Sequence, residues 1–197
     1  AITDIKRDME RARPMDRFEQ AGQAFAKLCR TMAKLRAPGG CAWDREQTLQ
    51  SLKPYVIEET YEVLDALDSG DPTAHRDELG DLLLQVVFQA ELCNETGSYG
   101  IADVVDAIDR KLVRRHPHVF GDVKATDATA ALSSWEKAKA AEKTKTGALD
   151  GIPRQMPALL RAMRTGEKAA AQGFDWPDPK GVLEKTEEEW REVHHAL

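Results

Sequence analysis

Five carboxylates occur in two short motifs, EExxE and ExxD, and these residues are the ones best suited to chemistry. They are Glu58, Glu59, Glu62, Glu78 and Asp81. Two carboxylates about 4 Å apart repel by about 4 kcal/mol at the effective dielectric constant of a protein surface. If the two motifs meet, the cluster therefore requires a cation. Ligation by oxygen alone, without His or Cys, indicates Mg²⁺, with Mn²⁺ as the other possibility, rather than zinc.

The two motifs are expected on consecutive helices, over residues 54–68 and 73–96. The segment DSGDP at 68–72 predicts a tight turn, so the helices should pack antiparallel and bring the acidic residues together. Residues 79–90 are apolar on nearly every side, which predicts a buried helix. A narrow polar stripe crosses that helix and consists of Glu78, Asp81, Gln85 and Gln89. Buried carboxylates are rare unless they are paired or bind a metal.

Taken alone, the first motif is also typical of an ordinary amphipathic helix. With a turn of about 100° per residue, Glu58, Glu62 and Asp65 lie within about 60° of one another, and Glu59 lies beside them. Apolar residues occupy the opposite face. Such a helix can simply have a solvated acidic side, so the metal site depends on the second motif.

Apolar residues at helical spacing predict further helices, and no strand signal of any length occurs. The expected ranges are 16–37, 101–115, 128–145, 156–172 and 180–197. Residues 38–40, with the sequence PGG, end the first of these helices. The segment 41–48 that follows is expected to be a loop carrying Trp43 and Asp44. The sequence therefore predicts an all-α fold.

The composition excludes several classes of function. Lys and Arg number 28 against 34 Asp and Glu, a net charge of −6 that argues against a general nucleic-acid or membrane-surface binder. The cysteines Cys29, Cys41 and Cys93 lack metal-ligand spacing, so reduced thiols are expected. No apolar run approaches about 18 residues, and the N-terminal segment is too charged for a secretory signal. We therefore expect a cytoplasmic protein.

EExxE followed by ExxD on the next helix resembles the MazG family of all-α nucleoside triphosphate pyrophosphohydrolases. Other motifs occur in the family's order, with GCAWDREQT at 40–48 before the acids and RRHPHVF at 114–120 after them. The segments WE at 135–136, LDGIP at 149–153 and GFDW at 173–176 are similar to further landmarks of the family. The resemblance covers about residues 20–193. It implies a helical bundle with an acidic helix hairpin, completed by homodimerisation.

The resemblance also implies an activity, hydrolysis of nucleoside triphosphates at the α–β bond to a monophosphate and pyrophosphate. Mg²⁺ held by the two acidic motifs would neutralise phosphate charge and lower the pKa of an attacking water. Glu59 and Glu62 are the catalytic candidates, and Glu59 could orient or deprotonate that water.

Phosphates are negatively charged, so basic side chains are expected near the acids. The candidates are Lys53, Arg76, Lys111, Arg114 and Arg115. The last three are equally explained as charges that complement the dipole at the end of the helix over 101–115. Trp43 could stack on the base of the nucleotide, or it could be a core-packing indole.

The first acidic motif recurs near the end of the chain. EETYEVLDAL at 58–67 and EEWREVHHAL at 188–197 match at six of ten positions. This predicts a MazG-like module over 16–146, a linker over 147–155 and a partial second module over 156–197. The second copy ends before another ExxD, which favours a truncated chain over a vestigial repeat. Because a repeated module can sense nucleotide without cleaving it, a regulatory nucleotide-binding module with little turnover is the alternative function.

Overall fold

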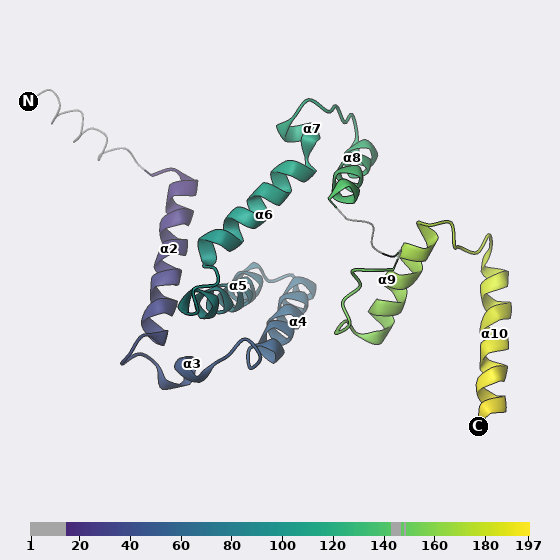
Figure 1. Cartoon of the computed structure of the whole chain (residues 1–197), viewed down its shortest axis with the longest axis horizontal. Coiled ribbons are helices and arrows are strands. Elements are labelled where there is room, and N and C mark those ends of the chain that lie inside the picture. Colours follow the sequence, from purple (N-terminus) through teal and green to yellow (C-terminus); the bar gives the residue numbers. More distant parts are fainter. Residues whose placement is uncertain (1–14, 143–146, 148) are drawn as a thin grey trace, which may run out of the picture. The chain divides into compact units, whose positions relative to one another are not determined.

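The computed structural model describes residues 15–142, 147 and 149–197, and every regular element in this part of the chain is a helix (Figure 1). The predicted all-α class is thereby confirmed. The chain divides into two compact units, residues 1–114 and 115–197. Among the described helices, none combines the length and the apolar character that crossing a membrane requires.

The part of the first unit that the structure describes, residues 15–114, is built from helices. They are α2 (Arg17–Arg36), α3 (Ala42–Glu46), α4 (Lys53–Ser69), α5 (Pro72–Glu95) and α6 (Ile101–Arg115). Four of these ranges agree within two residues with the sequence prediction. The exception is α3, a single short helix within the segment 41–48, which we expected to be a loop.

A tight turn joins α4 to α5 and makes the predicted hairpin. Gly70 ends α4 with a φ of 70°, a left-handed conformation that glycine adopts without steric cost. The side chain of Asp71 then accepts a hydrogen bond of 2.8 Å from the backbone N–H of Thr73, and Pro72 occupies the first turn of α5. The two helices pack along each other. The acidic residues of both motifs are thus placed on neighbouring helices.

The core of the first unit lies between α2, α5 and the start of α4. Its fully buried members are Met32, Leu52, Val87 and Phe88. The prediction that α5 is buried on nearly every side is wrong for one face, because Leu79, Leu83 and Val86 are 40–45% exposed. Contacts with α2 and α4 cover only part of the α5 surface.

The second unit contains α7 (Pro117–Phe120), α8 (Ala128–Ala141), α9 (Ala158–Ala170) and α10 (Pro179–Ala196). Helix α7 was not predicted, and it packs against α8. We expected the α8 helix to extend to about residue 145, but it ends at Ala141. Residues 143–146 and 148 lie outside the described residues, and so does part of the predicted linker. The module boundaries proposed above stay a prediction.

Candidate active site

Three carboxylates from the helix hairpin lie close together. Glu59 of α4 and Glu78 and Asp81 of α5 each offer an oxygen atom, and these atoms all lie within 4.8 Å of one another. Glu59 and Glu78 are partly buried, whereas Asp81 is exposed. Glu78 and Asp81 are three residues apart on one helix, a spacing that places them on the same face. Among the described residues, this acid cluster is the group that could hold a metal ion.

The carboxylates of the acid cluster repel one another, and this repulsion contributes to a raised pKa in two of them. Partial burial, followed by the charges of Asp81 and Glu62, raises the pKa of Glu59. Partial burial also raises the pKa of Glu78, with further contributions from Glu62 and Asp81. Both side chains are therefore harder to ionise than an isolated carboxyl group, and a cation placed among them would reverse that effect.

Gln85 is the buried polar neighbour of this cluster, with a relative exposure of 6%. Its Nε2 donates a hydrogen bond of 3.4 Å to Oε1 of Glu59. Its own Oε1 is buried and has no hydrogen-bond partner in the described part of the chain. A buried amide oxygen without a partner is costly. Because Gln85 follows Asp81 by one helical turn, this oxygen is a candidate acceptor for a ligand or ordered water at the cluster.

The structure brings together most of the predicted acidic residues, in an arrangement that differs from the expected one. Glu62 lies close enough to raise the pKa of both Glu59 and Glu78. Glu58 is exposed and does not belong to the group of three, so its role as a ligand stays a prediction. Glu59, expected beside the acidic stripe, is instead the α4 member of the cluster.

The position of Glu59 follows from the way α4 packs. Tyr55 packs against the core, and Ala66 is buried. Residues 55, 59, 62 and 66 follow the i, i+4, i+7, i+11 pattern and therefore lie on one side of the helix. Glu59 lies on this core-facing side between two packed residues, whereas Glu58 is turned away from it.

The basic candidates of the first unit lie at its surface. Lys53, at the start of α4, is exposed, as are Lys111 and Arg114 near the end of α6. Arg76 is also exposed and forms an ion pair of 2.7 Å with its neighbour Asp77. An exposed pair of this kind contributes little to stability.

Arg115 belongs to the second unit and contacts Glu142 and Trp135 there. Its Nη2 lies 2.7 Å from Oε2 of Glu142, and the Arg115 side chain is only 18% exposed. The guanidinium carbon also lies 5.3 Å from the centre of the Trp135 ring. Arg115 therefore contacts α8 within the second unit, and the sequence did not indicate these partners.

Trp43 lies in α3 and is half exposed, at 51%, so its indole is not a core residue. Its ring meets that of Tyr55 edge to face, with centroids 6.0 Å apart and planes at 77°. Tyr55 precedes Glu59 by one turn of α4. Through this ring contact, the exposed indole packs against the side of α4 that carries Glu59.

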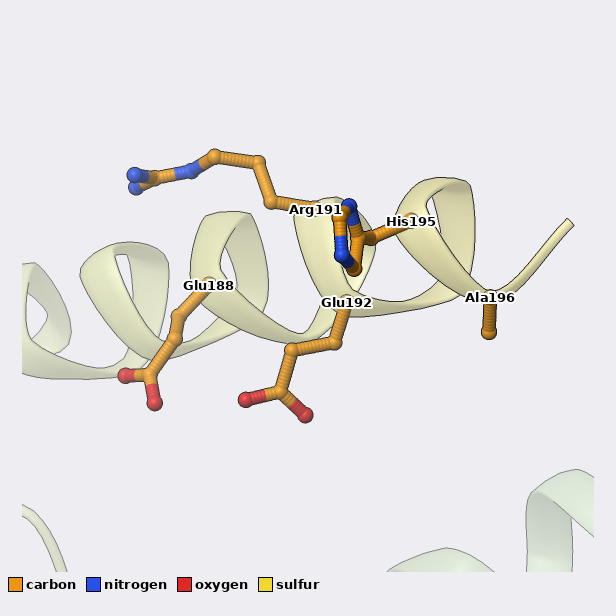
Figure 2. Close-up of a pocket in the computed structure, with 5 residues that line it drawn as sticks. All are labelled: Glu188, Arg191, Glu192, His195 and Ala196. Atoms are coloured by element: carbon orange, nitrogen blue, oxygen red, sulfur yellow. The ribbon is translucent and has the colours of Figure 1, made fainter.

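The second copy of the EExxE motif lies on α10. Figure 2 shows Glu188 and Glu192 projecting from the same side of this helix, with Arg191 on another side. Lys185 forms ion pairs of 2.7 Å with Glu188 and 3.2 Å with Glu189. In the described part of the second unit, no three metal-ligating side chains come together.

Comparison with known proteins agrees with this geometry. Residues 47–120 match the MazG nucleotide pyrophosphohydrolase domain, and this segment contains all the acidic candidates. A nucleoside triphosphate pyrophosphohydrolase/pyrophosphatase MazG of Thermotoga maritima is 47% identical over 181 residues, covering 91% of this chain and 69% of the relative. The chain belongs to the MazG family.

Two other relatives also match most of this chain. A nucleoside triphosphate pyrophosphohydrolase of Escherichia coli is 47% identical over 171 residues, which cover 85% of this chain and 65% of the relative. Another from Mycobacterium tuberculosis is 39% identical over 157 residues, which cover 79% of this chain and 47% of the relative. The resemblance seen in the sequence motifs is thus confirmed. The chain spans about two thirds of the length of the first two relatives.

Proposed function

We propose that this chain hydrolyses nucleoside triphosphates at the α–β bond, releasing a nucleoside monophosphate and pyrophosphate. The observation that carries the proposal is the meeting of Glu59, Glu78 and Asp81 within 4.8 Å on a MazG hairpin. The names of the relatives in Thermotoga maritima and Escherichia coli support the reaction class.

The donor set fits a hard divalent cation. Carboxylate oxygens are the ligands that Mg²⁺ and Mn²⁺ prefer, and neither His nor Cys belongs to the group. Glu59, Glu78 and Asp81 would hold the ion, with Glu62 beside them and Glu58 as a further candidate. When bound, the metal would neutralise charge on the phosphate oxygens and lower the pKa of a water molecule.

Glu59 is the residue best placed to act on the attacking water. It is partly buried and belongs to the acid cluster itself, so its carboxylate would lie beside a water that the metal activates. The hydrogen bond from Gln85 restrains its carboxylate, so one oxygen is held while the other can orient a water and accept its proton. Glu62, one turn further along α4, supports Glu59 with a second negative charge.

The substrate would be bound by exposed groups of the first unit outside the acid cluster. The basic side chains that would serve as charge-assisted donors to its phosphate oxygens are Lys53, Arg76, Lys111 and Arg114. Arg115 belongs to the second unit and forms an ion pair with Glu142 there, so it is left out of this set. The half-exposed Trp43 offers an aromatic face for the base.

We also infer that the first unit works as a homodimer. Ile57, Tyr61 and Leu64 of α4 are spaced at i, i+4 and i+7 and are 49–53% exposed. The exposed Leu79, Leu83 and Val86 of α5 repeat that spacing. Two apolar helix faces left in contact with water are typical of a surface that a second copy covers.

Pyrophosphate release from a panel of nucleoside triphosphates, with and without Mg²⁺, tests the proposed reaction. We expect equal amounts of monophosphate and pyrophosphate, only with the metal present, and a large loss in Asp81→Asn. The matched control is Asp109→Asn, which removes an exposed carboxylate from α6. Release of inorganic phosphate would mean cleavage at the β–γ bond. Tight nucleotide binding without any product would favour the alternative, a regulatory module.

A further inference from the structure

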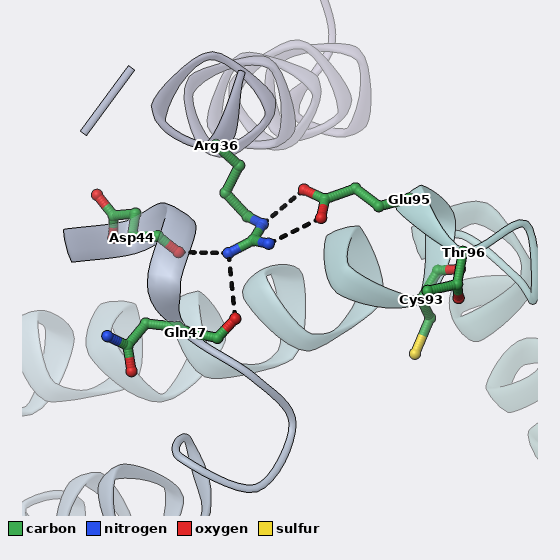
Figure 3. Close-up of polar contacts among 6 residues, drawn as sticks. All are labelled: Arg36, Asp44, Gln47, Cys93, Glu95 and Thr96. Carbon is green, nitrogen blue, oxygen red and sulfur yellow. Dashed lines mark hydrogen bonds and ion pairs between the residues drawn. The ribbon is translucent and has the colours of Figure 1, made fainter. Parts of the chain in front are cut away.

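Arg36, the last residue of α2, connects three segments of the first unit (Figure 3). Its guanidinium donates to both carboxylate oxygens of Glu95 at the end of α5, at 2.5 and 2.7 Å. It also donates to the backbone carbonyl oxygens of Asp44 and Gln47, the latter at 3.5 Å. One side chain thus bonds to the end of α5 and to the segment that contains α3.

The geometry of this guanidinium is tightly constrained. The Arg36 side chain is only 7% exposed, and its guanidinium carbon lies 5.5 Å from the centre of the Phe88 ring in the core. A buried charge is tolerated where it is paired and hydrogen-bonded, and the two-pronged contact with Glu95 provides both. That contact also lowers the pKa of Glu95. With the guanidinium held in this way, the two carbonyl groups that it binds are held as well.

Those carbonyl groups belong to the segment that carries Trp43. Asp44 directly follows Trp43 in the chain. The side chain of Gln47 donates a hydrogen bond of 3.0 Å from Nε2 to the backbone oxygen of Trp43. Gln47 is itself restrained, because its Oε1 accepts a hydrogen bond of 2.7 Å from Oγ of Ser51. Arg36 therefore fixes the chain at two points directly after the tryptophan.

Helix α3 depends on such contacts because it has little else to hold it. It contains five residues, none of them buried, and its N-terminus has no side-chain cap. A helix of this length is unstable in isolation, because nucleation costs more than so few hydrogen bonds return. At its start, the N–H of Cys41 donates to the carbonyl of Leu35 at 2.8 Å, which fixes that end to α2. The other end is fixed by Arg36.

We propose that Arg36 is a positioning residue for nucleotide binding: it holds α3 so that the Trp43 indole faces outward beside Tyr55 and accepts the base of the substrate. This inference rests on the proposed function. The ligand chemistry is the flat face of a nucleobase, stacked on an aromatic ring. Arg36 touches neither the phosphates nor the acid cluster in this arrangement, so its influence should be confined to recognition of the base.

The test compares a nucleotide with a ligand that has no base. Steady-state KM and kcat for a nucleoside triphosphate are measured together with the inhibition constant of inorganic tripolyphosphate. The variants are Trp43→Ala, Arg36→Lys, and the milder Glu95→Gln, with Arg30→Lys as the matched control on the exposed surface of α2. Lysine keeps the charge of Arg36 but cannot donate to Glu95 and two carbonyl groups at once.

We expect Trp43→Ala and Arg36→Lys each to raise KM by about tenfold, within the range expected for loss of a base–aromatic stack. The kcat value should stay within about twofold, and the inhibition constant of tripolyphosphate should not change. Glu95→Gln should raise KM by less, and Arg30→Lys should have no effect. The double variant Arg36→Lys/Trp43→Ala should have the same KM as Trp43→Ala, since both changes remove the same contact between the indole and the base.

Three results would overturn the inference. One is an unchanged KM in Arg36→Lys and Glu95→Gln, and another is additive effects in the double variant. The third is an equal rise in the tripolyphosphate constant, which would mean that the whole site had been distorted. If the wild type released no pyrophosphate, the proposed function would fail separately. The same comparison could then be made by calorimetric binding of nucleotide and tripolyphosphate.

Discussion

Replacing Asp81 with asparagine should remove most of the stabilisation that Mg²⁺ gives to the folded chain. The oxygens of Glu59 and Asp81 are among those that lie within 4.8 Å of one another. Two charges at about this separation repel by about 3 kcal/mol at an effective dielectric constant near 20, and by about 1 kcal/mol in bulk water. Because Asp81 is exposed, the actual repulsion lies between these values. The amide keeps the shape of the side chain and removes its charge.

The size of the metal effect follows from linkage. An ion that binds only the folded state at a hundredfold excess over Kd stabilises it by about 2.7 kcal/mol. For a chain of this size, that corresponds to a rise of about 5–10 °C in Tm. Asp81→Asn should lower the metal affinity and show less than half of this rise. In chelator it should be at least as stable as the wild type, because one repelling charge has been removed.

Thermal melts followed by circular dichroism measure this effect in chelator, in MgCl₂, and in NaCl at matched ionic strength. Asp109→Asn serves as the control and should respond to Mg²⁺ as the wild type does. Equal Mg²⁺-induced shifts in wild type and Asp81→Asn would refute the reasoning. So would a shift that NaCl reproduces, because general screening would then explain it.

Four further substitutions in the first unit should have measurable effects. Glu62→Gln should abolish Mg²⁺-dependent pyrophosphate release in an end-point assay while leaving the circular dichroism spectrum unchanged. Gly40→Ala should destabilise the chain by about 1–3 kcal/mol in urea unfolding, because a Cβ would overlap carbonyl oxygens at the end of α2. The contact with Arg36 lowers the pKa of Glu95. The stability that this contact gives the folded chain is therefore complete above the unfolded-state pKa near 4.3, and it is lost as pH falls through the folded-state pKa. Glu95→Gln should therefore lose less stability than the wild type between about pH 5 and 3. Leu83→Asp should shift the chain towards monomer in light scattering, because it places a charge in the exposed apolar face of α5.

Local signals in the sequence determined the long helices and the turn between α4 and α5. Residues 101–115 were predicted as a helix and form α6, and Gly70 and Asp71 make the expected turn. These features depend on neighbouring residues only: apolar residues at helical spacing, a glycine that ends one helix and an aspartate that caps the next. The two acidic motifs are visible for the same reason.

The short helices and the partner of Arg115 were decided by tertiary contacts. Helix α3 has five residues and too few internal hydrogen bonds to be predicted from its own sequence; contacts with Arg36 hold it. The ion pair between Arg115 and Glu142 joins residues separated by 27 positions, and no local pattern connects them. A basic residue at the end of a helix is ambiguous until its partner is seen.

The membership of the acid cluster was decided in the same way. The sequence places Glu58, Glu59 and Glu62 within one turn and a half of a helix, and any of them could face the ExxD motif. The choice depends on the rotation of α4 against α5, which is determined by the packing of Tyr55 and Ala66. That packing turns Glu59 towards Glu78 and Asp81 and leaves Glu58 exposed. The sequence alone thus determined that carboxylates would line the hairpin, whereas helix packing determined which of them meet.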